Sequence, residues 1–82
     1  MTDRSPSKRT DPVPETVRYA DGKVKYSGSL LGGEMHGAWE WFRKDGSLMR
    51  TGAFDRGQQV GVWRTFDRAG AVVKETDFRK SG

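Results

Sequence analysis

A single histidine is the residue best suited to acid–base or metal chemistry in this chain. His36 lies in the segment GGEMHG, two positions after Glu34. A general base needs a partner that orients it, and Glu34 is the candidate carboxylate in the same segment. A zinc site needs three or four ligands, and the chain has no cysteine. GGEMHG also lacks the lysine of a phosphate-binding loop. We therefore predict a protein that is not an enzyme and binds no metal or cofactor, with His36 packed at a turn.

Aromatic and basic side chains point to a second chemistry, the recognition of other molecules. Trp41 and Arg50 are predicted to lie opposite each other, where an exposed cation–π contact would contribute about 0.5–1 kcal/mol. The lysines and arginines could hold phosphates while tryptophans stack on bases. Acidic residues are interspersed with them and the formal net charge is only +4, a mixture typical of a soluble surface. We therefore expect a protein partner before nucleic acid or anionic lipid.

An internal repeat places these side chains. Gly28 and Trp39 recur 24 positions later as Gly52 and Trp63. The units are residues 19–42, residues 43–66 and a partial unit, residues 67–82. A fixed period of this size indicates an array of one supersecondary unit.

Residues 1–18 differ from the repeats, because they contain all three prolines and neither glycine nor an aromatic residue. Such a composition buries too little apolar area to offset the entropy of ordering, so it predicts a disordered or extended tail. The β-repeat domain would then span residues 19–82. The lack of cysteine and of a long apolar stretch favours a cytoplasmic location.

Turn signals in the repeats predict an all-β fold. Asp21-Gly22, Asp45-Gly46 and Ala69-Gly70 stand at tight-turn positions between stretches of alternating apolar and polar residues. We expect an antiparallel β-meander of tandem hairpins, forming a single twisted sheet with longer loops at residues 32–37 and 56–61. The five predicted strands are residues 23–31, 38–43, 48–55, 62–67 and 72–78.

Counting from these turns gives a register. It places Leu30 opposite Trp39 and Gly28 opposite Trp41 in one hairpin. In the next, it places Trp39 opposite Gly52, Trp41 opposite Arg50 and Phe42 opposite Met49. In this register the Trp39 ring covers the bare Gly52, which explains the recurring glycine.

One face of this sheet is predicted to be rich in aromatic rings, with no helix to cover it. Strong coiling of the sheet, a second copy or a partner protein would have to bury it. We expect the outer strands, residues 23–31 and 72–78, to have open edges. The predicted partner-binding residues are Tyr26, Trp39, Trp41, Arg50, Phe54 and Trp63.

The segment DGKVKYSGSLLGGEMHGAWEWF resembles a MORN-type repeat, in the variant common in bacterial proteins. Matching positions in the first unit are Gly22, Gly28, Gly33, His36, Gly37, Trp39 and Phe42. In the second they are Gly46, Gly52, Gly57, Gly61, Trp63 and Phe66, with Val60 in place of the histidine. The third unit departs at Thr76, where a glycine is expected. Short bacterial members of this group are labelled antitoxin-like, and eukaryotic relatives are linked to membrane lipids and scaffolding.

Two functions follow as hypotheses. The first is a non-catalytic protein-interaction module, antitoxin-like, that binds through its aromatic face and strand edges, with a homodimer as one form of that interaction. The second is a binder of anionic lipid or nucleic acid through lysine, arginine and exposed aromatic residues. Ionic strength separates them, because binding to phosphates weakens steeply with salt and an aromatic interface does not.

Overall fold

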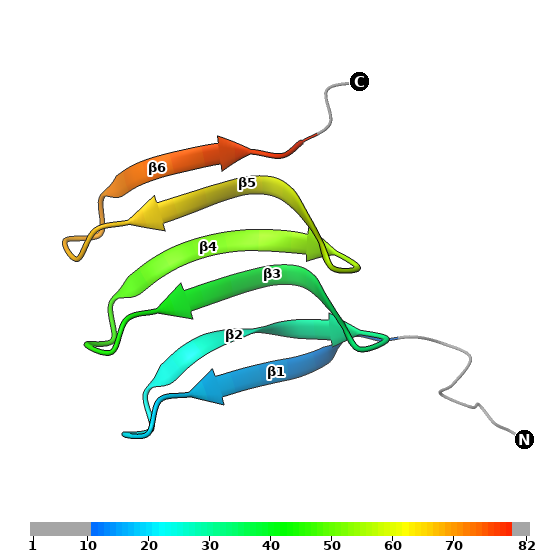
Figure 1. The fold of residues 1–82 in the computed structure, drawn as a ribbon, viewed down its shortest axis with the longest axis horizontal. Coiled ribbons are helices and arrows are strands. Elements are labelled where there is room, and N and C mark those ends of the chain that lie inside the picture. Colours follow the sequence, from blue (N-terminus) through cyan, green and yellow to red (C-terminus); the bar gives the residue numbers. More distant parts are fainter. Residues whose placement is uncertain (1–10, 80–82) are drawn as a thin grey trace, which may run out of the picture.

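Six antiparallel strands form one open sheet in sequence order in the computed structural model, which describes residues 11–79 (Figure 1). The strands are β1 (Val13–Arg18), β2 (Val24–Leu31), β3 (Glu34–Phe42), β4 (Leu48–Asp55), β5 (Gln58–Phe66) and β6 (Val72–Asp77). The shortest dimension is only 13 Å, as expected for one layer, because a second packed sheet would lie roughly 10 Å away. The predicted all-β antiparallel meander is confirmed.

Strand β1 is absent from the five-strand prediction. Residues 13–18, expected to belong to the tail, pair with β2, and Val17 lies opposite Tyr26. Pro14 is compatible with this strand because β1 is an edge strand, where a missing N–H breaks no ladder. The edge predicted at residues 23–31 is therefore wrong. Residues 1–10 of the expected tail and residues 80–82 of the expected domain lie outside the described residues.

The predicted loops at residues 32–37 and 56–61 are also wrong. Each is a two-residue turn, and the following residues continue as strand, so that Leu31 pairs with Glu34 across the first turn. Leu30 therefore lies opposite Met35, and the predicted pairing of Leu30 with Trp39 does not form. The predicted pairing of Gly28 with Trp41 is wrong for the same reason, since Trp41 lies opposite Tyr26.

A β-bulge absorbs the extra residues in β3 and recurs in β5. The β2–β3 register shifts between Ser27 and Ser29, so three residues of β3 face Gly28. Gly37 begins this bulge with φ of 80°, and its equivalent Gly61 has φ of 74°, values that favour glycine. The bulge bends both long strands near their starts (Figure 1).

The Asp-Gly turns are longer than predicted by one residue. The Arg43 N–H donates to the Ser47 carbonyl at 2.9 Å, so the loop has three residues instead of two. Phe42 then pairs with Leu48 and not with Met49. The register shifts again beside this pair. As a result, the predicted pairs Trp39–Gly52 and Trp41–Arg50 are confirmed.

Two tryptophans packed on two glycines form the core. A Cβ atom built on Gly28 would lie 2.0 Å from the Trp39 ring, and one built on Gly52 would lie 2.2 Å from the Trp63 ring. The glycines therefore leave space for indoles, as predicted, but Gly52 is covered by Trp63 and not by Trp39. Trp39 is 2% exposed and Trp63 is 7% exposed, so no second chain is needed to bury either ring.

Each indole also satisfies carbonyl groups at its bulge. Trp39 Nε1 donates to the Ser29 and His36 carbonyls at 3.1 and 3.3 Å. Trp63 Nε1 donates to the Ala53 and Val60 carbonyls at 3.2 and 3.1 Å. The bulge and the tryptophan thus form one structural unit in each hairpin. The ring covers the glycine, and the indole N–H donates to backbone carbonyls on both strands.

Candidate interaction face

Six aromatic rings form a continuous strip on one face of the sheet, from β2 to the residue after β6. Their centroids are separated by 5.1 Å for Phe54 and Trp63 and by 6.2 Å for Trp63 and Phe78. Phe54 stands nearly perpendicular to Trp63, with an interplanar angle of 88°, a favourable aromatic geometry. The members of this aromatic strip are Tyr26, Trp39, Trp41, Phe54, Trp63 and Phe78.

A row of six residues in register crosses the same face and changes character along its length. The members of this central row are, from β1 to β6, Val17, Tyr26, Trp41, Arg50, Thr65 and Lys74. The first three are apolar or aromatic and half-buried. The last three are polar, and Arg50 and Lys74 are exposed cations on either side of Thr65. The row therefore joins an aromatic half to a basic half.

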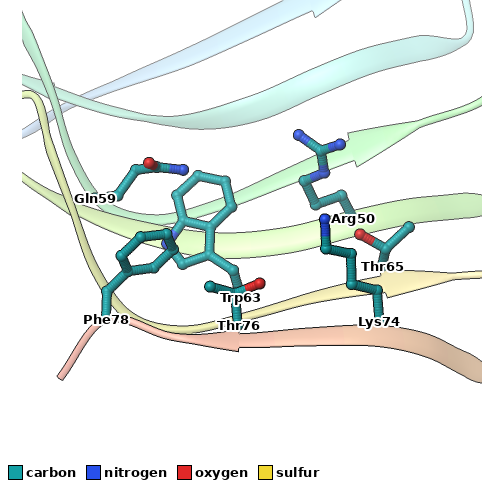
Figure 2. Close-up of a pocket in the computed structure, with 7 residues that line it drawn as sticks. All are labelled: Arg50, Gln59, Trp63, Thr65, Lys74, Thr76 and Phe78. Atoms are coloured by element: carbon teal, nitrogen blue, oxygen red, sulfur yellow. The ribbon is translucent and has the colours of Figure 1, made fainter.

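An open pocket of about 180 Å³ lies where the aromatic strip meets the basic end of the central row. Figure 2 shows Arg50 and Lys74 at one end of the pocket and the Trp63 and Phe78 rings at the other. The residues that line it are Arg50, Gln59, Trp63, Thr65, Lys74, Thr76 and Phe78. Two cations and the Thr65 hydroxyl lie at one end, and two aromatic rings lie at the other with the Gln59 amide and the Thr76 hydroxyl beside them. This arrangement suits a ligand that is anionic at one end and mainly apolar at the other.

The structure brings all six predicted site residues to this face. Tyr26, Trp41 and Phe54 are half-buried, so each presents part of its ring to the surface. Arg50 is exposed and lines the pocket. The buried rings of Trp39 and Trp63 form the floor beneath these side chains.

The predicted partner-binding residues lack five of the pocket residues: Gln59, Thr65, Lys74, Thr76 and Phe78. The signal for two of them is the repeat itself. Lys74 lies 24 positions after Arg50, and Phe78 lies 24 positions after Phe54. Residues at equivalent positions in consecutive units fall in one column of the sheet, two strands apart, so each known site residue also locates its counterpart in the next unit.

The predicted cation–π contact between Trp41 and Arg50 does not form, although the two residues pair in register. In the described part of the chain, cation–π contacts occur at Tyr19, where the ammonium groups of Lys25 and Lys44 lie 5.7 and 6.0 Å from the ring centroid. Arg50 instead lines the pocket.

His36 has a role in the backbone. Its Nδ1 accepts a hydrogen bond from the Arg56 N–H at 3.1 Å, which ties β3 to the turn between β4 and β5. The carboxylate near it is that of Asp55, at 3.8 Å, and not that of Glu34 in its own strand. This arrangement supports the predicted packing of His36 at a turn.

Carboxyl groups with altered pKa values lie outside the pocket. Hydrogen bonds from Ser47 lower the pKa of Asp45 in its turn. Hydrogen bonds from Arg79 lower the pKa of Asp77 to about 2. Both are exposed carboxyl groups, and hydrogen bonds from residues close in the sequence account for the lowered pKa values. Neither shift indicates a catalytic group.

Residues 11–79 contain no cluster of three or more metal-ligating side chains. Within the same residues, no helix has the length and apolarity to cross a membrane. Comparison of the chain with known proteins finds no matching family model, no matching curated protein and no matching solved structure.

Proposed function

We propose that this protein is a non-catalytic interaction module that binds a partner protein with its aromatic strip. The observation that carries the proposal is the aromatic strip itself, which lies on one side of a sheet only 13 Å thick. Tyr26, Trp41 and Phe54 are half-buried and Phe78 is 39% exposed. Aromatic residues held rigidly on a surface lose little entropy on binding and are typical of interface hot spots.

Rigidity comes from the buried part of the strip. Trp39 and Trp63 are held by packing on glycine and by hydrogen bonds from both indoles. The exposed rings therefore stand on a preorganised floor, which reduces the cost of ordering on association. In the antitoxin-like form of this proposal, the partner is a larger toxin-like protein.

Strand β6 offers a second contact surface beside the strip. Val72 and Val73 are 50% and 62% exposed on this edge strand. A partner strand could add to the open backbone of β6 while its side chains reach the strip.

Site-specific photocrosslinking in the native host cells tests the proposal. A photoreactive residue at position 41 lies on the strip, and one at position 40 replaces the neighbouring exposed Glu40, whose side chain points to the opposite face. We expect a protein crosslink from position 41 that also forms when a cell extract is irradiated at high salt, and none from position 40.

Equal crosslinking from both positions would contradict the proposal, as would crosslinks to nucleic acid or lipid from position 41. A crosslink between two copies of the chain through position 41 would replace the partner protein by a homodimer.

A further inference from the structure

Arg50 and Lys74 are two cations without an acidic partner among residues 11–79. The ion pairs that arginine makes in this region join Arg64 with Glu75, Arg68 with Asp45, and Arg79 with Asp77. Arg50 and Lys74 instead flank Thr65 on three neighbouring strands and line one pocket. Two like charges on one pocket repel each other, and the attraction of both to an anion bound between them offsets that repulsion.

The spacing of these cations suits one small anion. The two residues are separated by one strand, so their Cα atoms are roughly 10 Å apart. Arginine and lysine side chains are long enough to close that gap from both sides, and Arg50 can donate two parallel hydrogen bonds to a carboxylate. Thr65 and Thr76 add hydroxyl groups to the same pocket.

The other end of the pocket is mainly aromatic, with the Gln59 amide beside the rings. Trp63 uses its indole N–H for the Ala53 and Val60 carbonyls, so its ring offers no free donor. Phe78 is 39% exposed and stands at 81° to the Trp63 ring. A ligand that fills the pocket therefore carries an apolar group next to its anionic group.

We propose that this pocket binds an aspartate or glutamate side chain of a partner protein, with an aromatic or aliphatic residue next to it in the same segment. The inference rests on the proposed function, because the pocket is the end of the aromatic strip. It adds the chemistry of the segment that the strip recognises.

A protein carboxylate fits better than a nucleic-acid phosphate chain. The cations stand only at one end of the central row, whose other members are Val17, Tyr26 and Trp41. A strand of phosphates needs a path of several cations and free ring faces for base stacking. Trp39 and Trp63 lie on glycines and are only 2% and 7% exposed, so neither offers a whole ring face on which a base could stack.

Selection from a random-peptide phage library against the wild-type protein tests the inference. We expect the selected peptides to contain an acidic residue next to an aromatic or aliphatic one. Binding of a selected peptide should shift the NMR signals of the Trp63 indole and the Arg50 guanidinium. The double variant R50Q/K74Q should bind that peptide about tenfold more weakly or worse, because it loses both charge-assisted contacts.

The matched control is K25Q/K44Q, which also removes two positive charges, but beside Tyr19 and away from the pocket. This variant should bind the peptide like the wild type. Amide NMR spectra establish that each variant is folded, and the single variant K74Q replaces the double variant if that one does not fold. Inorganic phosphate and an oligothymidine are tested in parallel.

Each remaining result overturns the inference in a recognisable way. Peptides that lack acidic residues but bind Trp41→Ala more weakly than the wild type, or that bind R50Q/K74Q as well as the wild type, refute the acidic pocket and leave the proposed function standing. A selection in which no peptide loses affinity for either Trp41→Ala or R50Q/K74Q refutes both. Occupancy of the pocket by oligothymidine but not by acidic peptides assigns it to nucleic acid.

Discussion

The hairpin β2–β3 and the hairpin β4–β5 share one backbone and differ in what they offer to a ligand. Both have the same register, the same bulge and a tryptophan on the glycine of the preceding strand. At equivalent positions, Tyr26 becomes Arg50 and Trp41 becomes Thr65. The first hairpin therefore closes its surface with rings, and the second forms, together with β6, a pocket lined by cations and hydroxyl groups. The repeated residues build the sheet, and residues that change between repeats line the pocket.

The largest effect is expected from truncation of the buried indoles. Trp39→Ala should lower the free energy of unfolding by about 4 kcal/mol, within the range for loss of a large core aromatic residue. Trp63→Ala should cost about 3 kcal/mol, because the open pocket already borders that ring. Urea denaturation of both variants measures the difference. Equal losses would show that the pocket does not loosen the second hairpin.

Crowding of the two indoles should have a smaller effect that is similar in both hairpins. Gly28→Val and Gly52→Val each place side-chain atoms within the tryptophan ring, so each should cost about 2 kcal/mol by overpacking. Thr51→Val, on the opposite face of β4, is the control and should be nearly neutral.

A double variant refines this test. Gly52→Val with Trp63→Ala lets the new side chain enter the space that the indole leaves, so the combined loss should be smaller than the sum of the two single losses. A Gly52→Val protein that melts at the wild-type temperature would refute this account of the glycine.

The tight turns of the two hairpins differ in strain. Arg56 has φ of 49° at the position where the first hairpin has Gly32, with φ of 59°. Left-handed backbone is unfavourable for a residue with a Cβ, so Arg56→Gly should stabilise the protein by about 0.5–1 kcal/mol after the entropy cost of glycine is included. Thermal unfolding measures the gain, and Gly32→Arg should show a loss of similar size. Destabilisation by Arg56→Gly would mean that the arginine side chain contributes more than its backbone costs.

The smallest effect concerns the third unit, where Asp77 stands at the position of Ala53. Arg79 donates to both carboxylate oxygens and lowers the pKa of Asp77 from 3.8 to about 2. A lowered pKa in the folded state means that this pair stabilises the fold above pH 3.8 and that the contribution is lost as the pH falls toward 2. Arg79→Gln should return the carboxyl titration toward 3.8 in carbon-detected NMR, and Arg64→Gln should leave it unchanged.

The repeat made most of the sheet predictable. Glycine and tryptophan at a fixed offset indicated strands, their order and the pairing of Trp39 with Gly52. The hairpin turns were not predictable in the same way. Residues 32–37 and 56–61 have the glycine content of loops, but Gly37 and Gly61 lie in β-bulges inside strands. A positive φ satisfies either structure, and only the tryptophan hydrogen bonds at each bulge distinguish them.

Strand β1 and the pocket were missed for a related reason. Residues 13–18 align with residues 37–42 at the same offset, but Glu15 stands in place of the tryptophan. Pro14 also argues against a strand, because proline is uncommon inside strands. The pocket requires Arg50 and Lys74 to be compared across units, and each looks like a solvated surface charge when taken alone. A comparison of equivalent positions in consecutive units therefore locates the pocket, and inspection of a single strand does not.

Thr76 decides where an array of this unit has to stop. It lies opposite Trp63 at the position that is glycine in β2 and β4. A further unit would have to lay its tryptophan on this residue, and the Cβ of threonine fills the space that the ring needs, as it would at Gly28 and Gly52. Duplication of the unit can therefore lengthen the sheet by insertion between β3 and β4 but not by addition after β6. The same carbon atom keeps the tryptophan-bearing strands of other copies from packing on β6 in the way that β3 packs on β2.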